Sequence, residues 1–221
     1  KLARVLKQQA PAALLNTYDQ ERSQGADENI LNSTRATDFI TPKNRVTRLF
    51  RDTVLELAEQ YPFARPLVNS GRLSLPCTYE NSTLSTADAV TDKFPKTLRP
   101  GSSGKDAPIK ALNTAHSAEP WLLPQLGDRF VLLVDGRALP TEALAQLEQV
   151  TDLEIVVIAE QITTNYTTLK DSAGLVAERY DLQPGTAYLI RPDQHVAARW
   201  RQIHVDKVLA AMQRALGKEL V

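Results

Sequence analysis

The sequence predicts an α/β protein in which a helical N-terminal segment is followed by a domain with the element order βαβαββα and a mixed sheet. Apolar residues recur at helical spacing in the first third of the chain, whereas short apolar runs alternate with helical patterns after Pro120. The stretch between these parts is rich in proline and glycine. We therefore predict a helical tail at 1–73, a connector at 74–119 and an α/β domain at 120–221.

Three helical patterns occupy the tail. The first opens at Pro11, and the second begins at Asp27 and reaches Ile40. Thr41 can accept a hydrogen bond from the free amides of the third helix, and Pro42 suits the first helical position because proline has no amide to leave unpaired. We therefore predict that the third helix begins at Thr41 and Pro42.

The third helix carries a narrow apolar stripe. Its apolar residues follow the spacing i, i+3, i+4, i+8 and i+11 and are Val46, Leu49, Phe50, Val54 and Leu57. Charged residues fill most of the other positions. Such a stripe is typical of a helix that packs on another surface.

The connector lacks this helical periodicity and is rich in turn-forming residues. Its run Gly101-Ser102-Ser103-Gly104 follows no strand pattern and precedes no helical pattern, so we predict a flexible linker there. A structureless stretch of this length is unusual inside one domain, which favours a boundary between two units. We expect limited proteolysis to cut first within this connector.

Strand and helix patterns alternate in the last part of the chain. The predicted strands are 130–134, 153–158, 186–190 and 195–200, and the predicted helices are 142–147, 172–180 and one that carries Val205 to Leu216. The last two strands flank a Pro192-Asp193-Gln194 turn and predict a hairpin. This order resembles the minimal thioredoxin fold, with helices on both faces of the sheet.

Charge and composition exclude several classes of function. The 26 Lys and Arg residues balance the 26 Asp and Glu residues, so no net field attracts nucleic acid or an anionic membrane. No apolar run approaches the roughly 20 residues that span a bilayer, and no N-terminal pattern indicates a secretory signal. Cys77 is the single cysteine, which excludes an intrachain disulfide. We expect a cytoplasmic protein that binds neither nucleic acid nor membrane.

No catalytic, cofactor-binding or metal-binding residue is predicted within the chain. A thioredoxin-type enzyme needs a thiolate at the first strand-to-helix junction, but residues 135–140 read Asp-Gly-Arg-Ala-Leu-Pro. Cys77 lies in the connector and is interpreted as a half-buried thiol rather than a nucleophile. His116, His195 and His204 fall in three elements without metal-ligand spacing, and no glycine-rich phosphate loop occurs.

Two motifs resemble the single-component, phenol-hydroxylase-like flavoprotein monooxygenases. Residues 14–22 read Leu-Leu-Asn-Thr-Tyr-Asp-Gln-Glu-Arg and resemble the helix that follows the last FAD-contacting motif of that family. Ser23 and Gln24 stand where the family commonly has Arg-Pro. Residues 191–196 read Arg-Pro-Asp-Gln-His-Val and resemble a motif near the last hairpin of the cysteine-free, thioredoxin-like domain that commonly ends the family's chains.

The resemblance implies that the chain is the C-terminal portion of an enzyme that hydroxylates an aromatic, phenolic substrate with FAD, NAD(P)H and O2. The family's FAD-binding and substrate-binding motifs would lie upstream of Lys1, and the chain begins at Lys1 within a helical pattern rather than at Met. We therefore expect a fragment that neither binds FAD nor turns over alone. Its expected partners are the upstream flavin domain of the same protein and, as a homodimer, a second copy.

Two alternatives use the same predicted fold. The first is a non-catalytic, thioredoxin-like oligomerisation or interaction module, in which the domain at 120–221 supplies the homodimer surface. The second is a glutathione-transferase-like protein, which also combines a thioredoxin fold with helices. That family places its thioredoxin fold first, whereas here the fold comes last, so the order of the parts disfavours this alternative.

Overall fold

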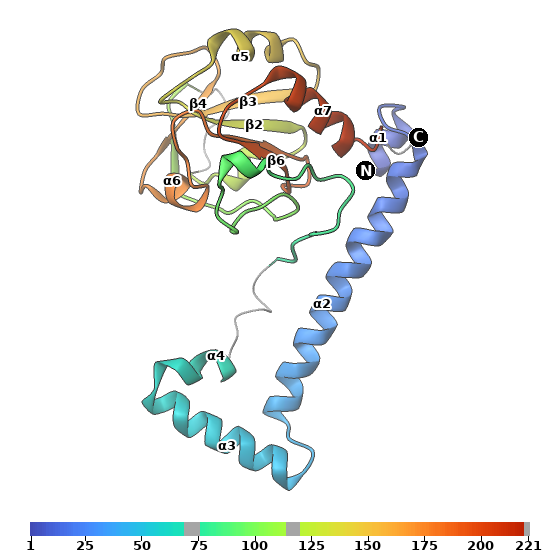
Figure 1. Cartoon of the computed structure of the whole chain (residues 1–221), viewed down its shortest axis with the longest axis vertical. Coiled ribbons are helices and arrows are strands. Elements are labelled where there is room, and N and C mark those ends of the chain that lie inside the picture. Colours follow the sequence, from blue (N-terminus) through green and yellow to red (C-terminus); the bar gives the residue numbers. More distant parts are fainter. Residues whose placement is uncertain (69–75, 114–119, 219–221) are drawn as a thin grey trace. The chain divides into compact units, whose positions relative to one another are not determined.

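The computed structural model describes residues 1–68, 76–113 and 120–218 (Figure 1). Its contacts divide the chain into two compact units. Unit 1 combines Lys1–Asp19 with Thr78–Val221, and unit 2 is Gln20–Cys77.

A six-stranded mixed sheet forms the centre of unit 1, with the strand order β1-β4-β3-β2-β5-β6. The strands are β1 (Ile109–Ala111), β2 (Phe130–Asp135), β3 (Leu153–Ile158), β4 (Thr167–Asp171), β5 (Ala187–Ile190) and β6 (Val196–Trp200). Neighbouring strands are parallel across β2, β3 and β4, and the other pairs are antiparallel. Every residue of β2 is buried, as expected of a central strand that is covered on both faces.

Helices cover both faces of this sheet (Figure 1). α5 (Thr141–Glu148) and α7 (Val205–Ala215) pack on the face that carries Leu132. α6 (Leu175–Arg179) packs on the opposite face, which carries Leu133. Successive side chains of β2 therefore enter two different apolar clusters, as the two-residue period of a strand requires.

The predicted fold class is confirmed. The strand order β3-β2-β5-β6, with α5 between β2 and β3 and α7 after β6, is the predicted thioredoxin-like arrangement. Two strands were not predicted: β4, which lies parallel to β3, and β1, which pairs with β4. In β4 the neighbouring buried residues are only Thr168 and Leu169, so no apolar run or alternation marks this strand in the sequence.

Most of the predicted connector belongs to unit 1, so the boundaries of the units differ from the predicted 74–119. The prediction of a flexible linker at Gly101-Ser102-Ser103-Gly104 is wrong. The Gly101 amide donates to the Val196 carbonyl (2.8 Å), and the Val196 amide donates to the Ser102 carbonyl (2.8 Å), so this segment pairs with β6 and covers the edge of the sheet. Gly101 has a φ of +90°, and a Cβ there would lie 2.3 Å from the Tyr79 carbonyl oxygen.

Arg199 in β6 binds residues 88–98 of the predicted connector. Its guanidinium pairs with the Asp88 carboxylate through Nε (2.9 Å) and Nη2 (2.7 Å). It also donates to three backbone carbonyl oxygens, those of Pro95 (2.8 Å), Thr97 (2.7 Å) and Leu98 (3.2 Å). The Arg199 side chain is only 1% exposed, so these partners replace the water that the charge has lost.

Phe94 adds an aromatic contact to the same anchor. Its ring centroid lies 4.4 Å from the guanidinium carbon of Arg199 and 3.9 Å from that of Arg201. The ring also meets Tyr188 edge-on, with 6.0 Å between the centroids. Because the ring face attracts cations, residues 86–98 are held on β5 and β6 by both charge and apolar contact.

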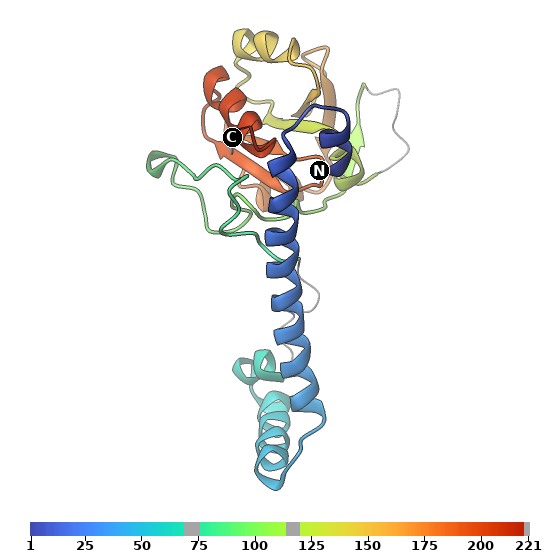
Figure 2. The ribbon, with the colours of Figure 1, turned by 90° about the vertical axis from the view of Figure 1, so that its right-hand side faces the viewer.

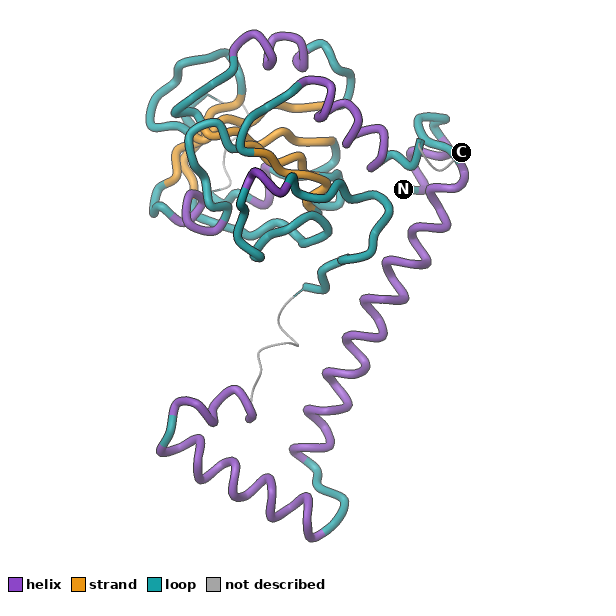
Figure 3. Tube along the Cα trace, in the orientation of Figure 1, coloured by secondary structure: helices purple, strands orange, loops and turns teal. Residues whose placement is uncertain are grey.

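Unit 2 is helical. α2 (Asn16–Ile40), whose first four residues belong to unit 1, is one continuous helix, although the sequence predicted two separate patterns over this stretch (Figures 2 and 3). It is followed by α3 (Arg45–Gln60), the short turn η2 (Pro62–Ala64) and α4 (Arg65–Val68). Among the described helices of the chain, none is long and apolar enough to cross a membrane.

The predicted start of α3 is wrong by several residues. Asn44 caps this helix, since its side-chain oxygen accepts a hydrogen bond from the Thr47 amide (2.9 Å). The Thr47 hydroxyl in turn accepts a hydrogen bond from the Asn44 amide (3.2 Å). This reciprocal capping box begins the helix at Arg45, and the predicted cap, Thr41, donates instead to the Thr37 carbonyl (2.7 Å).

Few side chains are buried within unit 2. In α3, which is described from end to end, only Val54 is buried. The helix α3 contacts η2 and α4, whereas the predicted stripe residues Val46, Leu49 and Phe50 remain exposed in this unit. Helices with so little buried surface gain little stability from packing, so we expect unit 2 to be the less stable unit.

We predict that the amides of α3 exchange with solvent faster than those of β3. Four successive residues of β3 are buried between two neighbouring strands, whereas α3 buries one residue. Hydrogen exchange followed by mass spectrometry reports both elements in one sample, and β3 should approach the protection set by global unfolding. Slower exchange in α3 than in β3 would contradict this expectation.

We also predict that Asp88→Asn lowers the free energy of unfolding by about 3 kcal/mol, because it leaves a buried guanidinium without its counter-ion. Urea unfolding followed by tryptophan fluorescence measures the loss. Glu80→Gln is the matched control, since the Glu80–Arg99 pair is exposed and should contribute less than about 1 kcal/mol. Equal losses for the two substitutions would show that the buried Arg199–Asp88 pair contributes no more to the free energy of unfolding than an exposed ion pair does.

Candidate functional site

A cleft of about 280 Å³ in unit 1 brings the two sequence motifs together. One wall comes from α1 (Leu2–Leu6) and the turn η1 (Ala12–Leu15), and the other comes from the β5–β6 turn and the end of α7. The charged residues that line it are Lys1, Arg4, Asp128, Arg191 and Asp193. Leu14 and Leu216 supply apolar surface between them.

The β5–β6 turn presents Arg191 and Asp193 to this cleft. The Arg191 amide donates to the His195 carbonyl (2.8 Å), and the Gln194 amide donates to the Arg191 carbonyl (2.9 Å), which closes the turn. Within this turn, the Arg191 guanidinium donates two hydrogen bonds to the Asp193 carboxylate, from Nε (3.0 Å) and from Nη2 (2.6 Å). The Arg191 side chain is 3% exposed and that of Asp193 is 46% exposed, so the pair reaches from the interior to the surface.

Asp193 is held in its charged form by its neighbours. Burial alone would raise the pKa of Asp193, but the hydrogen bond with His195 and the charge of Arg191 outweigh it and keep the pKa well below its usual range. The His195 ring stacks on Tyr79 with 4.8 Å between the centroids. This stacking fixes the ring beside the Asp193 carboxylate.

The opposite wall is anchored to the sheet unit by polar contacts. The Lys1 ammonium donates to the Thr17 hydroxyl (2.8 Å), which itself donates to the Leu14 carbonyl (2.6 Å). Arg4 forms an ion pair with Asp152, and its guanidinium carbon lies 5.5 Å from the ring centroid of Phe130. The charges of Arg4 and Arg191 are thus compensated by the carboxylates of Asp152 and Asp193. Polar contacts at the cleft therefore hold residues 1–19 in unit 1.

The residues of the first motif differ in their roles. Leu14, Thr17 and Glu21 are buried. The Thr17 hydroxyl links the Lys1 ammonium to the Leu14 carbonyl. Tyr18 is exposed. The motif therefore combines buried positions that fix the start of α2 with an outward-facing aromatic residue.

The strand-to-helix junction after β2 holds an ion pair. The buried Asp135 carboxylate accepts a hydrogen bond from the Arg137 amide (2.8 Å) and binds the Arg137 guanidinium. Arg137 also donates to the Leu182 carbonyl (2.8 Å). A Cβ at Gly136 would lie 2.7 Å from the Ala159 Cβ, so glycine allows the close approach of the two chain segments. Structural contacts occupy the place where redox thioredoxins carry their thiolate.

Cys77, in unit 2, is a poor nucleophile. Burial, followed by a hydrogen bond with the Glu28 carboxylate, raises the pKa of its thiol to about 11. Its side chain is partly buried, which confirms the interpretation as a half-buried thiol. The described residues contain no group of His, Cys, Asp and Glu side chains that could hold a metal ion, and His116 lies outside them.

No protein-family model matches the chain, and neither does any curated protein. Several solved structures do match the chain. The flavin-dependent monooxygenase PieE, in complex with FAD and substrate, is 21% identical over 98% of this chain and 42% of its own, with a TM-score of 0.66. Aklavinone-11 hydroxylase with FAD and aklavinone is 21% identical over 98% and 37%, with a TM-score of 0.58. The rebeccamycin biosynthetic enzyme RebC with reduced flavin is 21% identical over 98% and 38%, with a TM-score of 0.61.

These similarities establish the fold of the chain. Helical and sheet-containing units together match one part of each monooxygenase, because the similarity extends over 98% of the chain. The chain spans about two-fifths of the length of these enzymes. Its fold is thus that of part of a flavin-dependent monooxygenase.

We predict that Asp193→Asn destabilises the protein at pH 7 and has a clearly smaller effect at pH 2. The lowered pKa of Asp193 means that its contribution is present above the pKa of an unfolded carboxyl group and is lost as the pH falls through the folded value. Because Asp193 is nearly half exposed, the expected loss at neutral pH is about 1 kcal/mol. Urea unfolding at both pH values measures it, and a loss that grows on acidification would contradict the assignment.

Proposed function

We propose that this chain is the C-terminal portion of a single-component, FAD-dependent monooxygenase that hydroxylates an aromatic, phenolic substrate with NAD(P)H and O2. The observation that carries the proposal is the similarity of 98% of the chain to flavin-dependent monooxygenases such as PieE. The two sequence motifs stand in the order of that family and meet at one cleft. Such an enzyme relies on its flavin for the oxygen chemistry, while the protein binds and orients the reactants.

The cleft does not fit FAD. Its volume of about 280 Å³ lies below the roughly 300–1,000 Å³ of pockets for much smaller ligands. Arg4 and Arg191, which could meet phosphate groups, are already paired with Asp152 and Asp193. We therefore assign the cleft a structural role and place the FAD site of the proposed enzyme outside it.

The role proposed for this chain is to support the flavin-binding part of the same polypeptide. Unit 1 offers a sheet covered on both faces. Arg4 joins the N-terminal segment to the sheet-forming part through Asp152 and Phe130, and Lys1 connects this segment to Thr17 at the start of α2. A change at the cleft would act on the position of α2 and not on the flavin chemistry directly. A second copy of the chain is also a proposed partner.

Flavin binding tests the proposal. The purified chain mixed with FAD should leave the flavin fluorescence unchanged and should carry no yellow colour through gel filtration. A longer natural polypeptide that contains this sequence should bind FAD stoichiometrically and oxidise NADH or NADPH faster when a phenol is added. Stoichiometric FAD binding by the chain alone would refute the structural role, and a longer polypeptide without flavin would refute the enzyme.

A further inference from the structure

The charges of α3 oppose the dipole of their own helix. Three basic residues come first along the helix, Arg45, Arg48 and Arg51, and three acidic residues follow them, Asp52, Glu56 and Glu59. A lone helix is stabilised by acidic residues near its N-terminus and basic residues near its C-terminus, so this arrangement disfavours α3 in isolation. Beside an antiparallel helix with the same pattern it becomes favourable, because each basic half then faces an acidic half.

An apolar patch lies along the same helix. Val46, Leu49 and Phe50 follow the spacing of one helical face and are 76%, 68% and 61% exposed. Arg45 and Glu56 lie about three turns apart and therefore share one flank of this patch. Within the described residues neither of these two side chains has an ion-pair partner, so both are available to another molecule.

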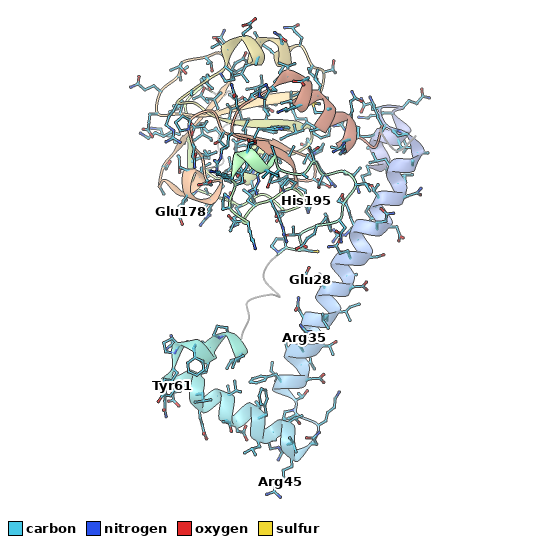
Figure 4. All side chains as sticks on the ribbon, viewed as in Figure 1. Glu28, Arg35, Arg45, Tyr61, Glu178 and His195 are labelled. Atoms are coloured by element: carbon cyan, nitrogen blue, oxygen red, sulfur yellow. The ribbon has the colours of Figure 1, made fainter. Side chains whose placement is uncertain are left out.

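Two more exposed aromatic residues lie at the other end of α3. Tyr61 and Phe63 follow the helix with 6.0 Å between their ring centroids, and both are exposed. Figure 4 marks Arg45 and Tyr61 at the two ends of α3. Among the described residues of the sheet-forming part of unit 1, the exposed large apolar residues are Val90, Trp121 and Ile162, which lie in three different segments of the chain. Single exposed residues of that kind are ordinary, whereas grouped ones indicate an interaction surface.

We propose that the exposed face of α3 binds the same face of a second copy in an antiparallel, two-fold symmetric pair. A two-fold axis that passes between Phe50 and Arg51 sets the two Phe50 rings against each other. It also places Arg45 of each copy beside Glu56 of the other. The chain has no net charge, so no overall repulsion opposes the pairing. A contact of two helices is small, and we expect reversible association in the micromolar range.

Sedimentation velocity of the whole chain across the micromolar range tests the surface. The chain should pass from monomer to dimer as its concentration rises, and Phe50→Asp should weaken the association at least tenfold. Ile162→Asp is the matched control, because it introduces the same charge at an exposed apolar residue of unit 1 and should leave the association unchanged. A chain that stays monomeric, or a dimer that survives Phe50→Asp, would overturn the proposal.

A charge exchange tests the geometry. Arg45→Glu and Glu56→Arg should each weaken the dimer several-fold, and the double variant should restore it, because the exchanged charges again meet across the two-fold axis. Each change also improves the match between charge and helix dipole, so loss of the helix cannot explain the weakening. Arg48→Glu, on the opposite side of α3, is the control and should have a smaller effect. A double variant weaker than both single variants would overturn the antiparallel arrangement.

Discussion

The arrangement of unit 1 depends on the buried guanidinium of Arg199. An arginine in the middle of a covered strand must find partners for all its donors, and Asp88 together with three backbone carbonyl groups supplies them. The same contacts satisfy carbonyl groups of a segment that has no regular secondary structure of its own. Residues 86–98 consequently fold onto the sheet, and Gly101 can then reach the edge of β6.

The two units are stabilised in different ways. The sheet of unit 1 is covered on both faces, and Arg4 and Arg191 at the cleft and Arg137 at the β2 junction have carboxylate partners within the unit. Unit 2 has long helices but buries few apolar side chains, and α3 carries a charge pattern that suits a partner helix. This contrast fits a chain whose sheet provides a stable base and whose helices make contacts with other protein surfaces.

The sequence predicted those elements in which local pattern and burial agree. The first five residues of β2 and the last four of β3 are continuous apolar runs because both of their faces are covered, and α7 has a clear helical period. The strand β4 was missed because its pairing with β3, rather than its own composition, makes it a strand. The anchoring of the connector and the meeting of Leu14 with Arg191 at one cleft depend on contacts between residues far apart in the chain, which no local period records.

Unfolding followed by two probes tests this account most directly. Trp121 and Trp200 both lie in unit 1, so tryptophan fluorescence reports that unit, whereas much of the helical circular dichroism comes from α2 and α3. If unit 1 is stable by itself and unit 2 depends on outside contacts, the circular dichroism signal of the dilute chain should fall at lower urea concentration than the fluorescence signal. A single coincident transition for both probes would contradict the account.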